Sequence, residues 1–349
     1  MGRCIIRDCK ASNYILAFDK DKGKFIRQGK NGIDPFWNVN GPELLDVSIT
    51  NYCERGCDFC YRLSNRNGKH IALSDYELIV RQAKEMGVLQ IALGGGNPNQ
   101  HPNFIEILRI TRRYGIIPSY TTNGQGVTED ILQATKDNCG AIAVSWYKPY
   151  HEAKLIIEKC IEYNIKINIH FMLDKNTIVE AIDLLKNHED VLNSINAIVF
   201  LNYKPIHTSA DLNLRESNRI KEFLECVKNT RVCKVGFDSC MISYLTLIGK
   251  NILIDTVDYC EAARFSAFVS EELILYPCSF YNDISAEGID LTKYSMQYGW
   301  KQGEQFVDIR KKLMIPGNQE YPIRLCEECE NVNLCHGGCP KFDINMCRR

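Results

Sequence analysis

The distribution of cysteine is the feature that most restricts what this chain can fold into. The 349 residues include 17 Cys, and three of them (Cys53, Cys57 and Cys60) fall in one short stretch. Five more lie in the last 24 residues: Cys326, Cys329, Cys335, Cys339 and Cys347. The opening residues MGRCIIRDCK lack the apolar h-region of a secretory signal, so we expect a cytoplasmic protein with reduced thiols. Clustered thiols in such a protein predict bound metal or an iron–sulfur cluster rather than a disulfide framework.

Composition and charge exclude two other classes. The chain has 42 Lys+Arg against 43 Asp+Glu, and this balance is unlike the basic footprint that a nucleic-acid partner requires. No run of 18 apolar residues is present, so we expect no membrane association. The apolar fraction of 45% and the charged fraction of 24% are typical of a globular protein with a substantial core.

A regular alternation of apolar strands and helices begins near residue 43. The predicted strands are 44–49, 88–93, 116–122, 141–145, 165–172 and 195–201, and a predicted helix follows each of them. Short, β-branched, apolar strands alternating with helices predict the α/β class, with a parallel sheet and right-handed crossovers. Six units are too few for a closed eight-stranded barrel, so the sheet is either doubly wound or an open partial barrel. In both cases chemistry belongs on the loops after the strands.

The flanking segments differ from this repeat. Residues 1–40 are predicted to hold a β-hairpin, 41–235 to form the α/β domain, and 236–349 to form a small, loop-rich C-terminal domain. That last segment has little apolar periodicity, so bound metal is expected to stabilise it. Within the α/β domain, Ser74 and Glu77 predict a capping box at a helix that Gly87 ends.

The first cysteine motif, Cys53-x3-Cys57-x2-Cys60, directly follows the first predicted α/β strand. Three thiolates can bind three irons of a cubane [4Fe-4S] cluster and leave the fourth iron open. Zinc is the alternative, but catalytic zinc usually takes His or carboxylate ligands too, and this loop contains no His. The spacing, together with Phe59 before the last Cys, resembles that of the radical S-adenosylmethionine (radical SAM) superfamily.

Several further motifs are similar to that family's cofactor-binding positions. Gly94-Gly95-Gly96-Asn97-Pro98 resembles its Gly-Gly-Glu-Pro element, so Gly95, Gly96 and Asn97 would contact the amino group of S-adenosylmethionine. Asn97 stands where Glu is usual and carries no charge, which weakens that contact. The resemblance also implies that Thr121–Gly124 and Ser145 line the pocket, with Ser145 bonding the ribose or the methionyl carboxylate. Asn202 and Tyr203 would lie near adenine.

The C-terminal cysteines resemble the SPASM extension of radical SAM enzymes, which holds two auxiliary [4Fe-4S] clusters. The gaps of two, five and three residues along Cys326, Cys329, Cys335 and Cys339 match, and Leu273 stands where the family has Gly. The resemblance implies a distal cluster on Cys326, Cys329, Cys335 and Cys347. A nearer cluster would be held by Cys260, Cys278 and Cys339, and its fourth iron would either take an upstream Cys, with Cys240 the candidate, or remain open to substrate. A zinc ribbon would account for four of these thiols but not for seven.

The resemblance implies an open partial (β/α)6 TIM-like barrel with a C-terminal iron–sulfur domain. It also implies an enzyme that reductively cleaves S-adenosylmethionine to a 5′-deoxyadenosyl radical, which abstracts a hydrogen from a ribosomally made peptide. Thioether formation is the first hypothesis, and epimerisation, carbon–carbon crosslinking or sulfatase-maturase-like protein modification are alternatives. The expected partners are a flavodoxin- or ferredoxin-type electron donor and a separate leader-peptide-binding protein. A non-catalytic, zinc-stabilised binding module is the remaining alternative.

Overall fold

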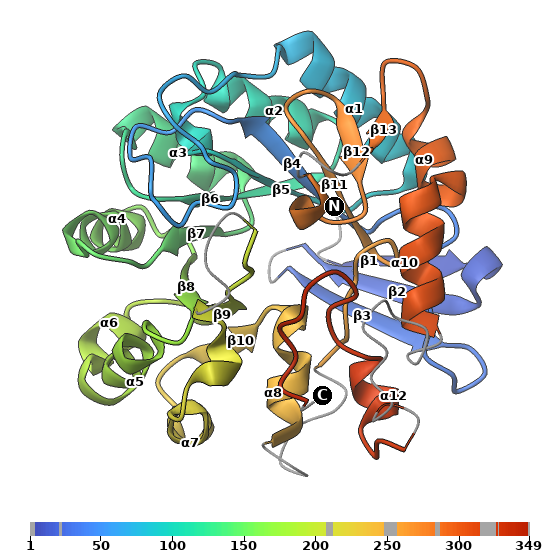
Figure 1. The fold of residues 1–349 in the computed structure, drawn as a ribbon. Helices are drawn as coiled ribbons and strands as arrows, with labels where there is room; N and C mark the ends of the chain where they lie inside the picture. Colours follow the sequence, from blue (N-terminus) through green and yellow to red (C-terminus); the bar gives the residue numbers. More distant parts are fainter. Residues whose placement is uncertain are drawn as a thin grey trace. The chain divides into compact units, whose positions relative to one another are not determined.

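The computed structural model describes residues 4–20, 23–206, 212–247, 257–282, 287–314, 326 and 328–347 (Figure 1). It divides into two compact units. The first comprises Met1–Ala143, Lys159–Lys166 and Ala262–Asp308, and the second comprises Val144–Glu158, Ile167–Glu261 and Ile309–Arg349. Three elements run across these boundaries in the sequence: β7 (Ile142–Ser145), α4 (His151–Glu162) and α10 (Glu304–Met314).

A six-stranded sheet organises the first unit, in the order β6-β5-β4-β11-β12-β13. Its strands are β4 (Leu44–Thr50), β5 (Gln90–Gly95), β6 (Ile117–Thr122), β11 (Ser266–Val269), β12 (Ile274–Tyr276) and β13 (Ile289–Asp290). The strands from β6 to β11 pair in parallel, whereas β12 and β13 are antiparallel to their neighbours. Residues such as Val47 and Ile91 are almost fully buried, as expected for parallel strands covered on both faces.

Four helices accompany this sheet: α1 (Leu73–Met86), α2 (Phe104–Arg113), α3 (Glu129–Asn138) and α9 (Met296–Gln302). Helix α2 packs against β6 and lies between α1 and α3 (Figure 1). Gly87 ends α1 with a left-handed φ of +84°, as predicted. The capping box was wrong, because α1 begins one residue before Ser74 and its N-cap is Ala72, which makes no side-chain cap hydrogen bond.

The N-terminal segment forms a three-stranded antiparallel sheet of β1 (Cys4–Cys9), β2 (Tyr14–Asp19) and β3 (Lys24–Gly29). The predicted hairpin is β2–β3, and β1 is an additional strand that the sequence reading missed. Glu43, which is fully buried just before β4, accepts hydrogen bonds from the Tyr14 hydroxyl and, at 2.7 Å, from Arg27 Nε. These contacts fasten the N-terminal sheet to the start of β4.

A parallel sheet of β8 (Ile167–Leu173), β9 (Ala197–Asn202) and β10 (Lys234–Phe237) forms the centre of the second unit. Helix α5 (Ile178–Asn187) packs against α6 (Glu189–Asn193) and α7 (Ile220–Asn229), and α8 (Ile242–Leu245) contacts α12 (Val332–Cys335). Strand β10 was not predicted, since it has four residues and includes Gly236.

The predicted α/β class and the open parallel sheet are confirmed, since the described strands of neither unit form a closed sheet. Among the described residues, no helix is both long enough and apolar enough to cross a membrane.

Candidate functional site

The loop that carries Cys53, Cys57 and Cys60 leaves the carboxyl end of β4 and is held by backbone hydrogen bonds. Cys53 N–H donates to Asn65 C=O at 3.0 Å, so the buried Cys53 is fixed against the far side of its own loop. Cys60 N–H donates to Cys57 C=O at 3.0 Å, which closes a tight turn between these two thiols. The three cysteines therefore lie on one short, anchored loop at the end of a parallel strand.

The glycines after β5 are required by this loop. Gly96 N–H donates to Thr50 C=O at 2.7 Å, and a Cβ at Gly95 would lie 2.0 Å from the same oxygen. A Cβ at Gly96 would lie 2.0 Å from the carbonyl oxygen of Tyr52. At Gly95 and Gly96 the missing Cβ leaves room for the backbone that leads to Cys53. The predicted contact of these two glycines with S-adenosylmethionine stays a prediction. Gly94, by contrast, has open space where a Cβ would be.

Asn97 connects the glycine loop to the loop after β6. Its side chain is 1% exposed, and its Oδ1 accepts from the Thr122 hydroxyl and from Asn123 N–H, both at 3.2 Å. Its Nδ2 donates to Gln125 C=O at 2.9 Å. Asn123 in turn donates from Nδ2 to Cys53 Sγ at 3.5 Å. A donor aimed at sulfur favours the thiolate, so Asn97 supports a residue that stabilises a candidate cluster ligand.

The other predicted pocket residues are distributed over both units. Phe59 is 39% exposed and belongs to the cysteine loop of the first unit. Ser145 ends β7 in the second unit, where Asn202 and Tyr203 lie at the end of β9 and are buried. Asn202 and Tyr203 thus lie at the carboxyl end of a parallel strand, where an α/β fold is expected to place a ligand site.

Contacts that the sequence did not predict join β4 and the cysteine loop to the β11–β12 hairpin and to the segment that follows it. Arg62 Nη2 and the Ser48 hydroxyl both donate to Glu271 Oε2, each at 2.6 Å, and the side chains of Arg62 and Glu271 are 5% and 8% exposed. The Tyr61 ring packs on Phe280 with centroids 4.6 Å apart, and burial raises the pKa of Tyr61 to about 12. Tyr61 follows Cys60, and Phe280 lies two residues after Cys278. The first unit therefore fixes Cys278 beside the cysteine loop.

The second unit gathers four of the C-terminal cysteines. Burial and the charges of Cys347, Cys326 and Cys329 together raise the pKa of Cys335 to about 12. Burial, Cys347 and Cys329 raise the pKa of Cys326, while burial and Cys329 raise that of Cys347. Thiols that influence one another in this way lie in a common neighbourhood, and these four are the ones expected to hold the distal cluster.

A second group in this unit contains Cys240 and Cys339. A hydrogen bond to Cys339, followed by burial, raises the pKa of Cys240 well above its usual value, while the charge of Lys204 opposes that rise. Cys260 is buried next to Tyr259, whose ring stacks on His336 with centroids 3.8 Å apart. Because His336 lies between Cys335 and Cys339 in the sequence, this stack holds the Cys260 segment against the C-terminal turn.

The residues present fit iron–sulfur clusters by the chemistry of their donors, since the gathered groups are thiols. Within the described ranges, no three His, Cys, Asp or Glu side chains converge on the position of one ion. A cubane binds each thiolate to a different iron, so its ligands are spaced more widely than those of a single zinc ion.

Hydrogen bonds join the C-terminal turn to α8. The Tyr244 hydroxyl donates to Ile344 C=O at 2.9 Å, and Met346 N–H donates to the Ser243 hydroxyl at 3.0 Å. A salt bridge of 2.8 Å joins Arg215 to Asp343. These polar contacts stabilise the turn, and the expectation that bound metal stabilises this segment stays a prediction.

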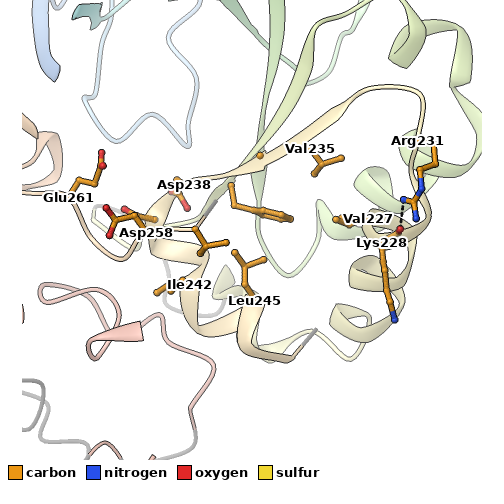
Figure 2. Close-up of a pocket in the computed structure, with 13 residues that line it drawn as sticks. Val227, Lys228, Arg231, Val235, Asp238, Ile242, Leu245, Asp258 and Glu261 are labelled. Atoms are coloured by element: carbon orange, nitrogen blue, oxygen red, sulfur yellow. Dashed lines mark hydrogen bonds between the residues drawn. The ribbon is translucent and has the colours of Figure 1, made fainter. Parts of the chain in front are cut away.

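A cavity of about 760 Å³ lies beside these residues in the second unit (Figure 2). Asp238, Asp258 and Glu261 line one end, Lys228 and Arg231 line the other, and apolar side chains lie between them. In the sequence, Asp238 lies two residues before Cys240, and Asp258 and Glu261 lie on either side of Cys260. The cavity thus has acidic side chains at one end and basic side chains at the other.

Three thiols on one anchored loop at the carboxyl end of a parallel strand define an α/β protein with a candidate metal-cluster site. Residues 47–212 match the model of the Radical SAM superfamily, so the chain carries a radical SAM domain. Among curated relatives, a probable GTP 3′,8-cyclase of Pyrococcus abyssi is 35% identical over 81 residues, 23% of this chain and 26% of the relative. The PqqA peptide cyclase of Gluconobacter oxydans is 27% identical over 95 residues, 27% of this chain and 26% of the relative. The chain thus spans about a quarter of the length of these relatives.

Solved structures share the fold over a much larger share of the chain. Streptococcus suis SuiB bound to its precursor peptide SuiA has a TM-score of 0.75 at 14% identity, and the match covers 99% of both chains. Native anSMEcpe with bound AdoMet and the Cp18Cys peptide has a TM-score of 0.60 at 17% identity, covering 85% of this chain and 89% of that one. The radical SAM fold predicted from the sequence is confirmed.

Proposed function

We propose that this protein is a radical SAM enzyme that modifies a peptide. The observation that carries the proposal is the anchored Cys53–Cys60 loop after β4 of a radical SAM domain, with Asn123 donating to Cys53 Sγ. When bound, a reduced [4Fe-4S] cluster and S-adenosylmethionine supply a 5′-deoxyadenosyl radical that abstracts a substrate hydrogen. Cys53, Cys57 and Cys60 would hold this cluster, and the open space at Gly94 would admit S-adenosylmethionine. Gly95, Gly96 and Asn97 would shape that pocket by fixing the cysteine loop.

Two auxiliary [4Fe-4S] clusters belong to the proposal. Cys326, Cys329, Cys335 and Cys347 would hold the distal cluster, which their mutual effect on pKa supports. Cys240, Cys260, Cys278 and Cys339 would hold the nearer one, which the hydrogen bond between Cys240 and Cys339 supports. These clusters would accept or relay an electron, and an external flavodoxin- or ferredoxin-type protein would be the donor.

The likeness to SuiB bound to its precursor peptide, over nearly all of both chains, favours a peptide as the substrate. Thioether formation is the first reaction to test. The likeness to anSMEcpe, solved with bound AdoMet and the Cp18Cys peptide, favours sulfatase-maturase-like protein modification as the second candidate. A short peptide encoded beside the gene, with or without Cys, would distinguish these substrates.

The test is anaerobic reconstitution with iron, sulfide, S-adenosylmethionine and a reductant, followed by measurement of 5′-deoxyadenosine and peptide mass. We expect Cys57→Ala to abolish 5′-deoxyadenosine formation, and Cys335→Ala to reduce peptide modification more than cofactor cleavage. Cys226→Ala, which lies on α7 outside both motifs, is the matched control and should retain both activities. A colourless wild type that binds zinc and forms no 5′-deoxyadenosine would refute the proposal and favour the zinc-stabilised binding module.

A further inference from the structure

Lys204 is a buried cation at the carboxyl end of β9. Its side chain is 4% exposed and forms a salt bridge with Asp238, which follows β10. The Asp238 carboxylate also accepts from Asn202 N–H, at 3.2 Å for each oxygen. An ammonium removed from water is costly unless it is paired, so this arrangement keeps Lys204 charged where the two strands end.

The same strand ends hold Cys240. Asn202 Nδ2 donates to Cys240 C=O at 3.3 Å, so a hydrogen bond joins the end of β9 to the turn that carries this thiol. The thiol of Cys240 forms a hydrogen bond with the thiol of Cys339, which lies 99 positions later in the sequence. The N–H of Cys339 donates to Oδ1 of the buried Asn345 at 3.2 Å. Both thiols act electrostatically on Lys204, and the charge of Lys204 favours the thiolate of Cys240. A buried cation and two thiols therefore lie close together at the ends of β9 and β10.

We propose that Lys204, held in place by Asp238, is a positioning residue that raises the reduction potential of the auxiliary cluster bound by Cys240 and Cys339. This inference rests on the proposed function, because it requires that cluster. One-electron reduction adds a negative charge to a cluster, and a nearby buried cation stabilises the reduced state. Net charge and local electrostatics are among the factors that set the potentials of iron–sulfur clusters.

The experiment is a redox titration, monitored by electron paramagnetic resonance, of the full-length protein after anaerobic reconstitution. Lys204→Gln removes the charge and keeps a polar side chain, whereas Lys204→Arg keeps the charge. Lys221→Gln, at an exposed position on α7, is the matched control for loss of a lysine. Cys240→Ser identifies the midpoint that belongs to the cluster in question, because it changes one ligand of that cluster alone.

We expect Lys204→Gln to move one midpoint to a more negative potential, the same midpoint that Cys240→Ser alters. The midpoint potentials of Lys204→Arg should lie close to those of the wild type, and Lys221→Gln should shift no midpoint potential. An unchanged midpoint in Lys204→Gln at wild-type iron content would overturn the inference, as would an equal shift in Lys204→Arg.

Loss of the cluster is also informative. If Lys204→Gln loses iron, recovery of both iron and potential in Lys204→Arg supports a role of the charge, and equal loss in Lys204→Arg overturns it. The wild type decides the proposed function separately, through its iron content and its formation of 5′-deoxyadenosine. If the wild type contains iron and forms 5′-deoxyadenosine but Lys204→Gln shifts no midpoint potential, only the role of Lys204 is refuted.

Discussion

The buried Arg62–Glu271 pair offers a sharp test of how the cysteine loop is attached to the β11–β12 hairpin. Arg62→Met leaves the Glu271 carboxylate, 8% exposed, with the Ser48 hydroxyl as its donor among the described residues. Breaking one partner of a buried pair costs about 3–5 kcal/mol, because an uncompensated charge stays buried. We therefore expect the free energy of unfolding to fall by about 3 kcal/mol or more.

The neighbouring residues provide the control. Lys69 and Glu272 join the same two segments at 3.0 Å, but their side chains are 77% and 60% exposed. An exposed pair contributes about 1 kcal/mol or less, so Lys69→Met should be nearly neutral. The assay is urea unfolding of the anaerobically prepared protein, followed by circular dichroism.

A double-mutant cycle separates the pair from the individual side chains. Arg62→Met combined with Glu271→Met removes both charges, and Ser48 keeps Thr50 C=O as an acceptor at 3.3 Å. Replacing a buried pair by apolar side chains is often neutral, so the double variant should recover most of the lost stability. If Arg62→Met costs no more than Lys69→Met, the reasoning from burial is refuted.

Three further predictions follow from the backbone geometry at Gly96 and Leu273 and from the lowered pKa of His170. Gly96→Ala should lose iron from the cysteine loop and about 1–3 kcal/mol of stability, because its Cβ meets Tyr52 C=O at 2.0 Å. Gly94→Ala should match wild type in iron analysis and unfolding, and an equal loss in both variants would contradict the steric argument. Leu273→Gly should destabilise the hairpin in thermal unfolding, since truncating a buried Leu costs about 2–5 kcal/mol. Relief of its left-handed φ of +63° returns only about 1–2 kcal/mol, so a stabilised variant would show that strain dominates. Burial lowers the pKa of His170 from 6.5 to about 4, so the unfolded chain binds a proton that the fold excludes. Below pH 6.5 the wild type should therefore lose up to about 1.4 kcal/mol per pH unit relative to His170→Asn, measured by urea unfolding between pH 7.5 and 5.5. Parallel pH profiles would contradict this assignment.

Local patterns in the sequence predicted much of the fold. Six apolar strands alternate with amphipathic helices, and each predicted strand lies within a few residues of a strand from β4 to β9. The Cys53–Cys60 spacing placed a thiol loop at the end of the first of them. Such features depend on neighbours in the sequence, so they can be read without tertiary contacts.

The contacts between distant segments could not be predicted in this way. Arg62 and Glu271 are far apart in the chain, and nothing near either residue reveals its partner. The reason for Gly95 and Gly96 was likewise hidden, because the backbone they admit belongs to another loop. Lys204 did carry a signal, since a charged residue two positions after a buried strand is unusual. Our prediction for that strand end named only Asn202 and Tyr203.

The pairing of β4 also bears on the order of events during synthesis. One edge of β4 pairs with β5, and the other pairs with β11, which begins at Ser266. The cysteine loop therefore leaves the ribosome long before β11, which completes the pairing of β4, has been synthesised. We expect cluster assembly at Cys53, Cys57 and Cys60 to be a late, post-translational event, and a fragment limited to residues 47–212 to expose an unpaired strand edge.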